Sequence, residues 1–166
     1  MSFKYLLDAN TYIQAKNLYY RMHVVPGYWD WLDQQFGAGQ VGSISMIYDE
    51  LFEYGDELSE WVKARRDRFF GVEDEQTQQK LAEIANYIVE HPTYAEPYIS
   101  QFLTGADAWL VAKAAVLGAE VVTHERRSGD NSKQIKIPNI CEVFGVVYKN
   151  TYDLMDSLQA KLILQP

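Results

Sequence analysis

Four acidic residues occupy positions where carboxylates from distant parts of the chain could meet. Asp8 follows a short apolar run, residues 3–7, which has no room for a helix and is expected to form a strand. Glu125 lies at the carboxyl end of residues 120–123 (EVVT), a segment that is typical of a buried strand. Because the carboxyl ends of parallel strands lie at one edge of a sheet, we expect both carboxylates at that edge.

The other two acidic residues lie in the early turns of helices. Asp107 opens an alanine-rich helix that ends at Gly118, and Glu50 lies inside the helix that follows a second strand. Four carboxylates in one place repel one another and are costly to ionise without a counter-ion. Hard oxygen ligands favour Mg²⁺ or Mn²⁺ over zinc. The sequence therefore predicts a magnesium or manganese site formed by Asp8, Glu50, Asp107 and Glu125.

Each of these residues has a simpler explanation when it is considered alone. Asp8 and Asp107 could each cap a helix, and Glu50 could be an ordinary surface residue. Glu53 lies one turn after Glu50 on the same face, so it could assist or replace it. His124 invites a catalytic role because the unperturbed pKa of histidine is near neutrality, but if the strand continues it alternates to the opposite side from Thr123 and Glu125, which disfavours that role. Only the joint occurrence of the four carboxylates supports a site.

Apolar runs alternate with segments of helical periodicity along the chain. Strands are predicted at 3–7, 40–44 and 120–123, and helices at 26–36, 46–54, about 57–69, 74–90, 107–117 and about 152–162. Ser45 is a candidate cap of its helix, residues 91–97 read as a loop, and residues 140–147 are a short apolar stretch. This alternation predicts an α/β protein with three layers, α/β/α, and a central, mainly parallel sheet.

The composition indicates one domain that spans residues 1–166. With 166 residues, of which 48% are hydrophobic and 14% aromatic, the chain is long enough for one sizeable core. It has no apolar run of about 18 residues, and its start becomes acidic at Asp8, so we expect a cytoplasmic protein with no membrane segment. The single cysteine, Cys141, can form neither an internal disulfide nor a zinc site and is expected to pack in the core.

The net charge of −8 argues against binding to nucleic acid, because affinity for phosphates comes from lysine and arginine. If several carboxylates converge on bound cations, much of the negative charge of the protein is concentrated at one point, and the charge of the cations cancels it there. Basic residues also cluster at 63–68 and at 126–136. The 4 tryptophans and 12 tyrosines are expected in the core and at partner interfaces rather than as platforms for bases.

Four motifs together resemble the PIN domain. They are residues 5–10 (YLLDAN), 47–51 (IYDEL), 106–114 (ADAWLVAKA) and 121–125 (VVTHE). Each motif alone is weak, but their order, spacing and expected secondary structure agree over about residues 3 to 147. The resemblance implies the PIN fold and metal-dependent endonuclease cleavage of RNA, with VapC-type bacterial toxins as the nearest functional relatives. It also implies an antitoxin partner, a homodimer, and products that carry a 5′ phosphate and a 3′ hydroxyl.

Further residues receive roles from this resemblance. Asn10 and Thr123 are expected to orient the ligating carboxylates by hydrogen bonds. Arg126, with Lys133 or Lys136, is expected to hold the backbone of the RNA. The chain departs from the family in two ways: Glu125 stands where aspartate is common, and the helical region 56–96 is longer than in compact members.

Three other functions are less well supported. A PIN-like module that binds RNA or protein without cutting would be expected to have lost one of the four carboxylates. Phosphoryl transfer of the haloacid dehalogenase kind needs a second aspartate two residues after Asp8, and Asn10 occupies that place. Dinucleotide binding needs a glycine-rich turn after the first strand, which this sequence lacks.

Overall fold

The computed structural model describes residues 3–165 and contains a five-stranded sheet in which every neighbouring pair is parallel. The strands are β1 (Tyr5–Leu7), β2 (Val41–Ile44), β3 (Phe69–Phe70), β4 (Glu120–Val122) and β5 (Tyr148–Lys149). Their order across the sheet is β3-β2-β1-β4-β5, so β1 lies at the centre. Leu7 pairs with Val122 in register, which brings the segments after β1 and β4 side by side.

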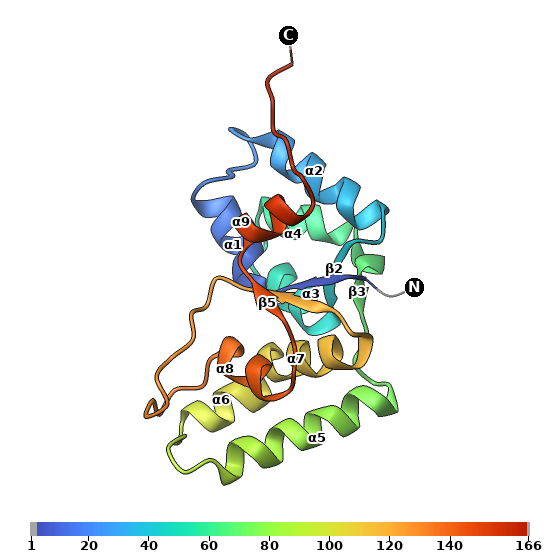
Figure 1. Ribbon diagram of the computed structural model, residues 1–166. Coiled ribbons are helices and arrows are strands. Elements are labelled where there is room, and N and C mark those ends of the chain that lie inside the picture. Colours follow the sequence, from blue (N-terminus) through green and yellow to red (C-terminus); the bar gives the residue numbers. More distant parts are fainter. Residues whose placement is uncertain (1–2, 166) are drawn as a thin grey trace.

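Helices cover both faces of the sheet (Figure 1). One side carries α1 (Ala9–Asn17), α2 (Pro26–Gly37), α4 (Glu57–Lys63) and α9 (Thr151–Ser157), and α3 (Ser45–Glu53) packs on α1 and α4. The other side carries α5 (Glu75–Glu90), α6 (Tyr98–Thr104), α7 (Ala106–Leu117) and α8 (Ile137–Val143). These layers confirm the expected α/β/α arrangement with a parallel sheet.

Helix α7 is the centre of its layer because it contacts the sheet and also α5, α6 and α8. Its small residues allow this close packing, and Ala108, Ala112 and Ala114 are fully buried. Gly118 ends the helix at a φ of 66°, in the left-handed region that glycine adopts without a steric penalty. Asp107 therefore sits in the first turn of a helix that is fixed along its length.

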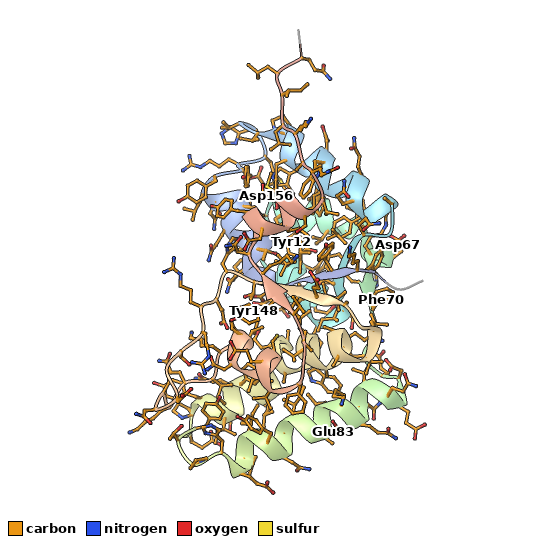
Figure 2. All side chains as sticks on the ribbon, in the orientation of Figure 1. Tyr12, Asp67, Phe70, Glu83, Tyr148 and Asp156 are labelled. Carbon is orange, nitrogen blue, oxygen red and sulfur yellow. The ribbon has the colours of Figure 1, made fainter. Side chains whose placement is uncertain are left out.

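The interior is rich in aromatic side chains, as expected. Trp29 and Trp31 are buried, Trp61 and Trp109 pack against the core, and Cys141 is buried as predicted. Figure 2 shows Tyr12 among the packed side chains between α1 and the sheet. Within residues 3–165, none of the helices is long and apolar enough to cross a membrane.

The predicted helix over 57–69 is wrong in its second half. Helix α4 ends at Lys63, a 3-10 turn follows at Arg66–Arg68, and Phe69–Phe70 forms β3. Phe69 lies against Tyr12, Phe36 and Tyr48, so tertiary packing overrides the local helical pattern.

Other boundaries also differ from the sequence-based expectations. Residues 98–104 form α6, which was not expected from the sequence, and only the first half of the apolar stretch at 140–147 lies in α8 (Ile137–Val143). Helix α9 ends at Ser157 rather than near residue 162. Ser45 is the first residue of α3, whose N-cap is Ile44 without a side-chain cap bond. These differences lie at short elements and ends, where periodicity carries little information.

Gly42 in β2 provides the first testable prediction. A Cβ atom at this position would lie 2.2 Å from the ring of Phe3, which is itself buried and packed on Phe70. Gly42→Ala should therefore lower the free energy of unfolding by about 1 to 3 kcal/mol, measured by urea titration. Gly37→Ala is the control, because a Cβ there meets nothing within 4 Å. Equal stability of the two variants would contradict this account.

Candidate active site

Asp8 leaves β1 at the edge of the sheet and is only 4% exposed. Its backbone N–H donates to the carbonyl of Val122 at 2.9 Å, which continues the pairing of β1 with β4. The hydroxyl of Thr123 donates to Asp8 Oδ2 at 3.0 Å. Although Asp8 is the N-cap residue of α1, its side chain makes no cap bond, so the carboxylate is directed to another use.

The pKa of Asp8 is raised to about 7, chiefly because burial disfavours its charge. Repulsion from Asp107 and, more weakly, from Glu125 adds to this increase, and the bond from Thr123 opposes it. Among the described residues, no lysine or arginine forms an ion pair with Asp8. Asp8 is thus a buried carboxylate whose charge is not compensated by a basic side chain.

The charged form of Asp107 is also disfavoured, although its pKa is raised less than that of Asp8. Burial raises its pKa to about 6, and repulsion from Glu125 and Glu50 contributes in the same direction. Lys136 lowers the pKa of Asp107 but does not cancel the increase. Asp8, which is buried, and Asp107, which is partly buried, therefore form the centre of the acidic cluster.

Glu50 and Glu125 lie at the margin of this cluster. Glu50 is on the exposed side of α3, and its pKa is raised by partial desolvation and by repulsion from Glu53, its neighbour one turn later. Glu125 follows β4, and its Oε2 accepts the backbone N–H of Ile137 at 2.8 Å. The other carboxylate oxygen of Glu125 lies 4.0 Å from Lys136 Nζ.

The four carboxylates thus influence one another without forming a closed set of ligands. Repulsion from Glu50 and Glu125 raises the pKa of Asp107, and repulsion from Asp107 and Glu125 raises the pKa of Asp8. In the described part of the chain, no group of three or more His, Cys, Asp or Glu side chains is arranged to hold a metal ion. The ligand set predicted from the sequence stays a prediction.

The chemistry of the donors nevertheless fits a divalent cation. Asp8 is buried and Asp107 is partly buried, and their raised pKa values indicate that negative charge is unfavourable at both positions. A bound cation would reverse that effect, because an opposite charge nearby favours ionised carboxylates. With oxygen as the donor atom, Mg²⁺ and Mn²⁺ suit this cluster better than zinc.

The residues expected to support the cluster are placed unequally. Thr123 links the site, because its oxygen also accepts the N–H of Glu125 at 3.1 Å while its hydroxyl donates to Asp8. Asn10 is exposed, and the structure shows no side-chain hydrogen bond for it within residues 3–165. Lys136 lines a hollow together with Asp107.

The two remaining basic residues lie on the segment after β4. Arg126 is exposed and lines a second hollow with Thr123 and Glu125. Lys133 is exposed on the following loop, and its carbonyl accepts the N–H of Ala95 at 3.3 Å. Arg126 therefore lies beside the acidic cluster, whereas Lys133 contributes to the anchoring of the loop.

Two contacts were missed at the level of sequence. The backbone N–H that holds Glu125 comes from the start of α8, where Pro138 in the first turn was an available signal. His124 Nε2 lies 3.0 Å from Thr151 Oγ1, and burial lowers the pKa of His124. No motif spacing connects residues 124 and 151, so this contact depends on the position of α9.

The sheet order and its flanking helices define a PIN-like α/β fold, as the motifs predicted. One similar structure is the crystal structure of VapBC2 from Rickettsia felis bound to a DNA fragment from their promoter. A chain of that structure matches with a TM-score of 0.56 and 13% identity, over 88% of the present chain and 97% of its own. At this identity the likeness shows a shared fold.

The chain belongs to a family described as a domain of unknown function, DUF4411, whose model matches residues 5–162. Comparison with curated protein sequences gave no match. Family membership therefore covers nearly the whole chain.

The acidic cluster predicts a specific pH dependence of stability in metal-free protein. Because the pKa values of Asp8 and Asp107 are raised by folding, their contribution is fully present below about pH 4 and is lost as the pH rises through about 6 to 7. Asp8→Asn removes one of these charges and should raise the melting temperature at about pH 8 more than at about pH 5, measured in EDTA by calorimetry. Each kcal/mol corresponds to about 2 to 4 °C.

The control for this experiment is Asp67→Asn, since Asp67 is exposed and precedes β3, at the opposite end of the parallel strands from Asp8. If Asp8→Asn destabilised the protein equally at both pH values, Asp8 would be an ordinary structural carboxylate.

Proposed function

We propose that this protein is an endoribonuclease that depends on Mg²⁺ or Mn²⁺ and hydrolyses phosphodiester bonds in RNA. One observation carries the proposal: the buried carboxylate of Asp8, which has no basic partner, and the partly buried carboxylate of Asp107 lie together at the carboxyl edge of a PIN-like sheet, and both have raised pKa values. Such a cluster is unfavourable in the free protein and becomes favourable with a bound cation.

Different residues of the chain would bind the metal and position its ligands. Asp8 and Asp107, with Glu50 and Glu125, would bind the metal, and Thr123 would hold Asp8 in place. When bound, Mg²⁺ or Mn²⁺ supplies a water molecule of lowered pKa and neutralises charge on the phosphodiester. Cleavage of the bond between phosphorus and O3′ leaves a 5′ phosphate and a 3′ hydroxyl.

Basic residues on both sides of the cluster would hold the RNA backbone. Lys136 lines the hollow that contains Asp107, and Arg126 lines the hollow that contains Glu125. Lys133 would contribute from the exposed loop between them. A phosphate contact from each side would place the scissile bond over the acidic cluster.

We further propose that the nuclease is the toxin of a bacterial toxin-antitoxin pair, acts in the cytoplasm as a homodimer, and is inhibited by an antitoxin protein. This part is supported by the fold shared with a chain in the VapBC2 structure and by the motifs in the sequence.

A second candidate is a PIN-like module that binds RNA or protein without cutting it. The open arrangement of the carboxylates favours it, because no three acidic side chains of the described chain are set for a metal ion. Cleavage assays separate the two functions directly.

Cleavage of labelled bacterial RNA tests the nuclease. We expect discrete products with Mg²⁺ or Mn²⁺, none with EDTA, and a loss of at least about 100-fold in Asp8→Asn and Asp107→Asn, because residues that only orient a ligand already contribute about 10- to 100-fold. Glu83→Gln, on the outer face of α5 (Figure 2), should cleave like the wild-type protein. Cleavage that does not require metal, or cleavage by the two Asn variants at the wild-type rate, would overturn the proposal.

Thr123 offers a test of positioning. Thr123→Val removes the hydroxyl that donates to Asp8, so we expect the concentration of Mg²⁺ that gives half-maximal activity to rise about 10-fold or more. Thr123→Ser keeps a hydroxyl, so the concentration of Mg²⁺ that it needs for half-maximal activity should stay close to that of the wild-type protein. An unchanged Mg²⁺ requirement in Thr123→Val would show that this hydrogen bond does not support the site.

A further inference from the structure

Three aromatic rings from separate segments meet next to the acidic cluster. Tyr19 follows α1, Tyr152 is in α9, and His124 follows β4. The ring of Tyr152 lies 6.3 Å from that of Tyr19 and 6.0 Å from that of His124, measured between centroids. Tyr19 is 70% exposed and Tyr152 is 45% exposed. These two tyrosines therefore differ from the core aromatics, because much of their ring surface faces solvent.

Two hollows adjoin at these rings. The first is lined by Tyr19, Tyr152 and His124, among others. The second is lined by Tyr152 and His124 and continues to Thr123, Glu125 and Arg126. Both hollows have Tyr152 and His124 among their lining residues, so they lie against the same two rings. We call the two hollows together the aromatic cleft.

The walls of the aromatic cleft are held in place by the fold. The bond between His124 and Thr151 ties α9 to the segment after β4. Behind Tyr19, the ring of Tyr20 stacks on the buried ring of Tyr28, with 4.2 Å between centroids and 7° between planes. These contacts fix the segments that carry Tyr19 and Tyr152, which reduces the backbone entropy lost when a flat ligand binds.

Charge along the cleft favours a ligand with few phosphates. Lys149 also lines the second hollow, but it is paired with Glu120 at 2.8 Å, and Arg127 is paired with Asp130 and Glu142. Arg126 forms no ion pair or side-chain hydrogen bond with any other residue in the described chain, so its guanidinium is available. One such arginine suits a single phosphate, whereas duplex binding uses many phosphate contacts.

We propose that the aromatic cleft binds unpaired bases of single-stranded RNA by stacking on Tyr19 and Tyr152, with Arg126 on the adjoining phosphate. Stacking suits a protein of net charge −8, because it adds affinity that does not depend on positive charge. The cleft leads to Glu125, so the stacked nucleotides would lie beside the bond to be cut. This inference rests on the proposed RNA function but concerns binding, not cleavage.

Binding measured without cleavage tests the cleft. Fluorescence anisotropy with a labelled, unstructured RNA of about 12 nucleotides would be recorded in an Asp8→Asn background. We expect Tyr152→Leu and Tyr19→Leu to bind roughly 5- to 100-fold more weakly, and Tyr152→Phe to bind as the background protein does. Phe52→Leu is a matched control, since Phe52 is also 45% exposed but lies on α3.

The same binding measurements are repeated at several salt concentrations and with duplex RNA. The loss in Tyr152→Leu should persist at high salt, whereas Arg126→Gln should reduce the slope of log K against log salt by about 0.7. A duplex of the same sequence should bind more weakly than the single strand. Equal binding of duplex and single strand, equal losses in Phe52→Leu, or no RNA binding at all would overturn the proposal. If the wild-type protein binds single-stranded RNA but cuts no RNA, the proposal that the aromatic cleft binds RNA is retained and only the proposed nuclease activity is overturned.

Discussion

The structure depends on one constraint, which is the burial of the Asp8 carboxylate where β1 ends. Burying an ionised carboxylate costs several kcal/mol unless it is paired or strongly hydrogen-bonded. The fold provides hydrogen bonds from the Thr123 hydroxyl and the Ala9 backbone N–H, and it adds Asp107 and Glu125 as further negative charges. A protein selected only for stability would place an apolar or neutral residue here. The arrangement is explained when the site is built to receive positive charge.

The parallel sheet is what creates that constraint. Pairing of β1 with β4 brings Asp8 to Thr123, and the packing of α7 on the sheet brings Asp107 to the same edge. Neither residue is close to the other in sequence, so the site is a product of topology. Ligand sites at the carboxyl edge of parallel strands are a general property of such sheets.

Part of this arrangement could be predicted from the sequence, and the reasons are physical. The strands before Asp8 and Glu125 are buried apolar runs, and α7 is a long helix with small residues and a terminal glycine, so each has a strong local signal. β3 and β5 have two residues each and show no periodicity. The direction of the Glu125 side chain depends on the N–H of Ile137, which belongs to a helix that tertiary packing places.

The sequence distance between the paired strands affects how the protein comes into being. Asp8 and Thr123 are separated by 115 residues, although their side chains are hydrogen-bonded. During synthesis, the first strand leaves the ribosome long before β4 exists, and domains of this kind fold only when their non-local pairings can form. The acidic cluster therefore cannot assemble before the segment up to Glu125 has been synthesised. If the protein cleaves RNA as proposed, a growing chain that has not yet reached Glu125 lacks part of the site and cannot do so.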